Sequence, residues 1–205
     1  MVAAVTVPDT AVVASFLNLG PARWWQFKDL NSNGKISRWE CAELTPDRFQ
    51  LRARLGNTRV EHVVESKEVE LEGVRLPQLT VVESKIDDQV ATWVGGLVMP
   101  ASWKVGDTVS ATSKEAANPA TGNPVQLTVK LVKHGPFQPP PGTPFPPDRP
   151  LEVVQLDQRV IDAKLAIKLA ESHQVFALGV GICEAKGNNF GSYYALQFQD
   201  WSGAH

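Results

Sequence analysis

A run of oxygen-bearing side chains at alternate positions is the part of this sequence best suited to chemistry. Over residues 29–40, side-chain oxygens stand at the first, third, fifth, ninth and twelfth places, and Gly34 stands at the sixth. Alternate residues of a tight loop converge on one point, a glycine permits the sharp turn, and Ca²⁺ takes six to eight oxygen ligands at about 2.3–2.6 Å. The predicted calcium ligands are the side chains of Asp29, Asn31, Asn33, Ser37 and Glu40, directly or through water, and the carbonyl of Lys35.

This stretch resembles an EF-hand loop, and its Asp-Leu-Asn opening is similar to dockerin-type loops. The resemblance is local to residues 29–40 and brings no whole-chain family with it. It implies calcium as a cofactor, held at the weak end of the range, about 10⁻⁴–10⁻³ M, because only two ligands are carboxylates. The alternative is an ordinary turn in which Asp29 and Asn31 make local backbone hydrogen bonds.

A calcium loop of this kind needs a helix on each side, and the flanking residues suggest two short ones. Pro21 fits a first helical position, and Ser37 can cap a second helix that Thr45-Pro46 closes. We therefore expect a helix-loop-helix over residues 21–48. Residues 1–20 form an apolar arm whose valines are interrupted by Pro8.

The rest of the chain divides into three segments. Residues 49–134 alternate apolar and polar side chains between frequent turns, which predicts an antiparallel sandwich or barrel. Residues 135–150 are a proline-rich linker or clamp. Within residues 151–205 we expect a helix from Asp157 to Glu171 and then a β-hairpin packed on the body, although Ile161 to Leu169 also alternate like a strand. The predicted class is α+β and β-rich, as an antiparallel sandwich or barrel with a short N-terminal helix-loop-helix and one helix before the C-terminal hairpin.

Composition limits the function. The chain has 205 residues, 43% of them hydrophobic, and a net charge of −2, so it lacks the bulk positive field of a nucleic-acid-coating protein. Two distant cysteines, Cys41 and Cys183, make neither a disulfide framework nor a zinc site. We expect no membrane span and no secretory signal, and therefore a soluble or virion-associated protein.

Other chemically versatile residues are scattered. The four histidines stand among unlike neighbours, which favours surface or packing roles. Tyr193 and Tyr194 are adjacent in a predicted strand, so one should face the core and the other the surface. Catalytic signatures such as a Walker loop or a nucleophile elbow are absent from the sequence.

Three functions are compatible with these features. The arm, the strand-rich body and the proline-rich clamp favour a non-enzymatic structural or interaction protein, a subunit of a homo-oligomer or larger assembly such as a virion or surface layer. The first alternative is a single-stranded nucleic-acid-binding module of the OB type, which the net charge disfavours. The second is an enzyme whose fold calcium stabilises.

Overall fold

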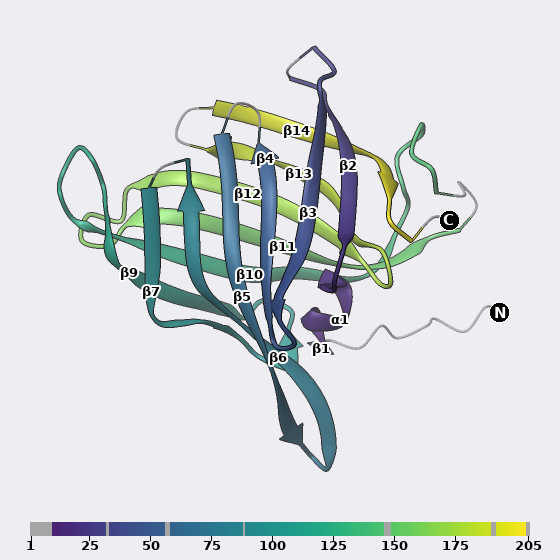
Figure 1. Cartoon of the computed structure of the whole chain (residues 1–205), viewed down its shortest axis with the longest axis horizontal. Helices are drawn as coiled ribbons and strands as arrows, with labels where there is room; N and C mark the ends of the chain where they lie inside the picture. The colour runs from purple at the N-terminus through teal and green to yellow at the C-terminus, as the bar shows by residue number, and fades with distance from the viewer. Residues whose placement is uncertain are drawn as a thin grey trace.

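One antiparallel sheet closes on itself as a twelve-stranded barrel in the computed structural model (Figure 1). The structure describes residues 10–31, 33–55, 58–87, 89–145, 149–189 and 192–203. The strands of the barrel are β2 (Arg23–Asp29), β3 (Ile36–Thr45), β4 (Arg48–Leu55), β5 (Thr58–Leu71), β6 (Val74–Ile86), β7 (Gln89–Met99), β9 (Thr108–Ala117), β10 (Pro124–Phe137), β11 (Leu151–Asp162), β12 (Lys168–Ala177), β13 (Gly181–Asn189) and β14 (Ser192–Trp201).

The chain runs up and down around the barrel, and the first strand meets the last. Each strand pairs antiparallel with the next strand of the barrel along the chain, and residues 196–201 of β14 pair with residues 25–29 of β2. This seam pairs the two strands that would otherwise be the edges of the sheet.

A short helix plugs one end of the barrel. α1 (Val13–Leu17) packs against β6, β11, β12 and β13, and its Val13, Phe16 and Leu17 are buried. Asn18 ends the helix in the left-handed conformation and donates from Nδ2 to the Gly179 carbonyl (3.1 Å), which ties α1 to the turn between β12 and β13. A ribbon of β1 (Thr10–Ala11) and β8 (Trp103–Lys104) precedes the helix. We call this the plugged end, and the opposite end, with the turns after β2, β9 and β11, the rim.

The predicted helix-loop-helix over residues 21–48 is wrong, because both segments are strands of one β-hairpin. In β2 the side chains of Trp25, Phe27 and Asp29 are buried, and in β3 those of Trp39 and Cys41 are buried, always at every second residue. Bulky aromatic side chains with a period of two suit a pleated sheet with one buried face. The caps at Pro21 and Ser37 were compatible with helices, but this alternation outweighs them.

The predicted helix from Asp157 to Glu171 is also wrong, and with it the α+β class. Strands β11 and β12 occupy this segment, and Asp157 pairs with His173, whose Nδ1 lies 2.6 Å from the carboxylate. The alanine- and lysine-rich residues after Asp162 form a tight turn. Asp162 is fully buried and accepts hydrogen bonds from the backbone of this turn and from side chains of the turn after β9, and so holds two rim turns together. The β-rich body is confirmed.

The proline-rich segment follows β10. Within it, the Phe145 ring stacks on Phe198 at a centroid distance of 4.9 Å and lies against Trp201, so this part of the segment covers the end of β14. Most of the apolar arm, residues 1–9, lies outside the described residues, and residues 10–20 form β1 and α1.

Strands β5 and β6 continue beyond the barrel. β4 pairs with β5 as far as Glu65, and β7 pairs with β6 from Leu79, so residues 66–78 pair as a two-stranded hairpin. Figure 1 shows this hairpin projecting past the plugged end. Within the described parts of the chain, no helix has the length and apolar character that crossing a membrane requires.

Candidate functional site: the barrel cavity

The interior of the barrel contains a cavity of about 150 Å³. Leu17 and Leu19 line it at the plugged end, and Gln89 and Ala117 line it near the rim. Since Gln89 and Ala117 are exposed, the cavity extends from the helical plug towards solvent at the rim.

Most of the wall is apolar, because alternate residues of each strand face the interior. Valine, leucine, isoleucine and alanine supply most of the lining, together with the rings of Trp25, Trp39 and Trp93. Among the described lining residues, Glu171 is the one carboxylate, and it is paired with Lys168 at 2.8 Å. None of them is a lysine or an arginine.

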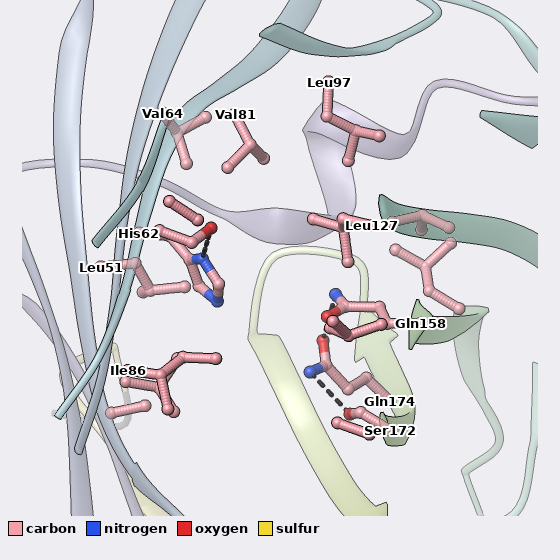
Figure 2. A pocket seen from close by; sticks show the side chains of 18 of the residues that line it. Leu51, His62, Val64, Val81, Ile86, Leu97, Leu127, Gln158, Ser172 and Gln174 are labelled. Atoms are coloured by element: carbon pink, nitrogen blue, oxygen red, sulfur yellow. Dashed lines mark hydrogen bonds between the residues drawn. The ribbon is translucent and has the colours of Figure 1, made fainter. Parts of the chain in front are cut away.

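A polar cluster interrupts the wall where β5, β6 and β7 lie side by side. The Trp93 indole, which can only donate, gives its Nε1 proton to Ser84 Oγ at 2.9 Å. His62 Nδ1 lies 2.8 Å from the same oxygen, and because the described residues offer the Ser84 proton no other acceptor, we assign Ser84 as the donor and the ring proton of His62 to Nε2. No hydrogen bond joins Nε2 to any other described residue, and Figure 2 shows this nitrogen directed into the cavity.

Burial sets the charge of this cluster. It lowers the pKa of His62 from 6.5 to about 4, because the apolar wall disfavours the charged imidazolium. The imidazole is therefore neutral at physiological pH and offers one N–H donor to the cavity.

A second polar group lies on β11 and β12. Gln158 Nε2 donates to Gln174 Oε1 (3.2 Å), and Gln174 Nε2 donates to Ser172 Oγ (2.9 Å). Ser172 also forms a hydrogen bond with the hydroxyl of Tyr194. Burial raises the pKa of Tyr194, and this hydrogen bond lowers it by a smaller amount. Among the described residues no donor is bonded to Gln158 Oε1, so this oxygen keeps a free lone pair.

The two polar groups face each other across the cavity. Five strands separate β5 from β12 in either direction around the barrel. Figure 2 shows His62 and Gln158 on opposite walls with the open interior between them. We call them the histidine pole (His62, Ser84 and Trp93) and the amide pole (Gln158, Gln174 and Ser172).

The residues of the predicted calcium loop lie along the β2–β3 hairpin. Asp29, Asn31, Asn33 and Lys35 are at its turn, where Asp29 Oδ1 accepts from the Asn31 amide (3.0 Å) and the Asp29 carbonyl accepts from Gly34 (3.1 Å). These are the local bonds of the turn alternative.

Ser37 and Glu40 lie farther along β3. Ser37 donates to the Arg54 carbonyl at 2.6 Å. Glu40 pairs with Trp24 on one side and Arg52 on the other and forms an ion pair with Arg38 at 2.9 Å, so the hairpin does not bring it to the turn. The described residues contain no group of three or more His, Cys, Asp or Glu side chains that could hold a metal ion. Calcium binding stays a prediction.

Most of the cavity residues were missed by sequence reasoning, which gave the histidines ordinary surface or packing roles. A signal was present, because Val60, His62 and Val64 alternate on one strand face and so place an imidazole among core valines. The opposite facing of the two tyrosines is confirmed: Tyr194 is 2% exposed and Tyr193 is 70% exposed. Both cysteines are buried free thiols.

Comparison with protein-family models, with curated proteins and with solved structures finds no match for this chain.

Proposed function

We propose that this protein binds a small, largely apolar molecule inside its barrel. The observation that carries the proposal is the apolar cavity with two convergent polar groups, which is the usual composition of a small-molecule site.

The composition of the wall supports the same proposal. The lining is largely apolar, so a ligand that fills the cavity removes apolar surface from water, at about 25 cal/mol per Å². The imidazole and the amide pole supply hydrogen-bonding atoms that can fix the orientation of such a ligand.

Thermal unfolding with toluene, a molecule of suitable size, tests the proposal. A ligand that binds only the folded state at a hundred times its Kd stabilises by about 2.7 kcal/mol. For a chain of this length, that corresponds to a rise in Tm of roughly 5–10 °C. We expect this rise in the wild-type protein, with saturation.

Neighbouring residues of β7 offer a matched pair of variants. Ala91 lines the cavity opposite Ser84, whereas Val90 is exposed on the outer face. Ala91→Phe should fill the cavity and remove the effect of toluene, and Val90→Phe should keep it. If toluene stabilises both variants equally, the interior cavity is not the binding site.

The sequence also motivates proposals that concern other surfaces. A role as an assembly subunit is supported by the strand-rich body and the proline-rich segment, and calcium binding by the spacing of residues 29–40. Both are compatible with a ligand inside the barrel, because the predicted calcium ligands and the proline-rich segment lie outside the cavity lining.

A further inference from the structure

The two poles restrict the chemistry of the ligand, an inference that rests on the proposed function. The direction of the histidine pole follows from Ser84, because its oxygen accepts from Trp93 and His62 Nδ1 is the one acceptor for its proton among the described residues. The group that His62 presents to the cavity is therefore an N–H donor. Its natural partner is a hydrogen-bond acceptor on the ligand.

The charge of the lining excludes ionised ligands. No lysine or arginine is present among the described lining residues, and the pKa of His62, lowered to about 4, keeps the imidazole uncharged at neutral pH. A carboxylate or phosphate placed here would lose its hydration without gaining a counter-charge. The acceptor must belong to a neutral group, such as a carbonyl.

The amide pole makes a second demand on the opposite wall. Gln158 donates to Gln174 and Gln174 donates to Ser172, so Gln158 Oε1, on a residue that lines the cavity, is left as an acceptor without a described donor. A hydroxyl or amine hydrogen on the far side of the ligand would satisfy it.

We propose that the barrel selects an uncharged molecule, about the size of one substituted aromatic ring, with a carbonyl-type acceptor for His62 Nε2 at one end and a polar hydrogen for Gln158 Oε1 at the other. An apolar body of that size fits the apolar wall between the poles. The polar groups at the two ends of the ligand therefore decide which molecules of this size bind most tightly.

Matched ligands and two variants separate the poles. Acetophenone and cumene have similar shapes, but only acetophenone has an acceptor; 4-hydroxyacetophenone and 4-methylacetophenone differ in a polar hydrogen. Isothermal titration calorimetry gives the Kd of each for the wild type, His62→Phe and Gln158→Leu. Comparing the ratio of Kd values within a ligand pair between the wild type and a variant cancels the difference in ligand hydration, as in a double-mutant cycle.

His62→Phe should reduce the preference for acetophenone over cumene by about fivefold to tenfold, the size of one neutral hydrogen bond. It should leave the preference for the 4-hydroxy over the 4-methyl compound nearly unchanged. Gln158→Leu should do the reverse, so each variant is the control for the other. Benzoate, which matches acetophenone in shape but is charged, should bind the wild type at least about tenfold more weakly than acetophenone.

Each result has a clear meaning. If cumene and acetophenone bind but neither ratio responds to its variant, the selection by poles is overturned and apolar binding stands. Benzoate binding as tightly as acetophenone would overturn the requirement for an uncharged ligand. If none of these compounds binds, the proposed function fails and takes the inference with it.

A further variant keeps the test decisive if His62→Phe does not fold. Ser84→Ala retains the imidazole but removes the hydroxyl that fixes its direction. It should lower the acetophenone preference by a smaller factor than His62→Phe, about twofold to fivefold. An unchanged preference in Ser84→Ala would contradict a role for the histidine pole.

Discussion

His62 is held neutral by the same wall that forms the cavity, so its protonation is coupled to folding. The unfolded chain binds a proton at this residue near pH 6.5, whereas the folded chain does so only near pH 4. Between these values the unfolded state binds more protons, and the stability falls as the pH falls.

We therefore expect the free energy of unfolding to decrease between pH 6.5 and pH 4 by up to about 3 kcal/mol on account of His62. Above pH 6.5 the residue should contribute no pH dependence. Urea unfolding from pH 7.5 to pH 4 in the wild type and in His62→Phe measures this, since the variant should lose that part of the slope.

Asp162 is a second buried group whose titration makes the free energy of unfolding depend on pH. Burial favours its protonated form, but hydrogen bonds led by those from Thr121, Leu165 and Asn118 hold its pKa well below the usual value. The stability that Asp162 contributes is fully present above the pKa of an aspartate in the unfolded chain. It is lost as the pH falls towards the lower pKa of Asp162 in the folded protein. Because Asp162 is unchanged in His62→Phe, a slope identical in the two proteins would mean that His62 is not the residue titrating.

At the residue scale, sequence reasoning found the facing of the tyrosines, which follows from local alternation. It missed the poles, because the partners of each lie far apart in the chain. Ser84 is 22 residues from His62, and Gln174 is 16 residues from Gln158. Only the strand register makes them neighbours.

The turn between β12 and β13 shows how one element is held against the plug. Gly181 has a φ of 93°, and a Cβ built there would lie 2.7 Å from the Trp25 ring. Trp25 in turn donates to the Val180 carbonyl at 2.6 Å. The turn and the indole therefore fit only if residue 181 has no side chain.

Gly181→Ala should destabilise the protein more than Gly179→Ala, because both add backbone strain but only the first adds a clash. Gly179 has a φ of 73° and open space around its built Cβ, so its substitution should cost about 1 kcal/mol. For Gly181→Ala we expect roughly 2–4 kcal/mol in all. Equal losses in chemical denaturation would show that the Trp25 ring gives way without cost.

At the element scale, composition misled the prediction where it competed with periodicity. Proline, serine and alanine at positions typical of helices suggested helices at residues 21–48 and 157–171, yet β2, β3, β11 and β12 occupy them. The period of two was visible in both segments. A strand gains its stability from paired neighbours and from a shared buried face, so local propensity does not decide its formation.

At the scale of the whole molecule, the closed barrel should contribute much more to the free energy of unfolding than the projecting hairpin does. Residues 66–78 pair with each other beyond the barrel, and an isolated two-stranded hairpin is marginally stable. Replacing residues 68–77 with Asn-Gly should change the free energy of unfolding by less than about 1 kcal/mol. Strand β14 should be indispensable, because it closes the barrel with β2.

A chain that ends at residue 191 tests the contrast. Without β14, strands β13 and β2 become free edges, and we expect loss of the cooperative transition and aggregation. Size-exclusion chromatography and thermal unfolding by circular dichroism compare the two deletions. A truncated chain that stays monomeric and unfolds cooperatively would contradict the importance of the seam.

The number of strands and the closure of the barrel were beyond sequence reasoning, which left sandwich and barrel open. Alternation specifies that a strand has a buried face, but it does not specify which two strands meet last. The pairing of Trp25 with Trp201 joins opposite ends of the chain.

That pairing also sets an order of events during protein synthesis. Strand β2 leaves the ribosome early, yet its second partner, β14, is made last. While the chain is being made, the growing sheet has two unpaired edges, one at β2 and one at the strand made most recently. Its apolar inner face cannot be enclosed until β14 is available to pair with β2. The barrel therefore cannot close before β14 has left the ribosome, and until then the free edges of the growing sheet are open to pairing with other chains.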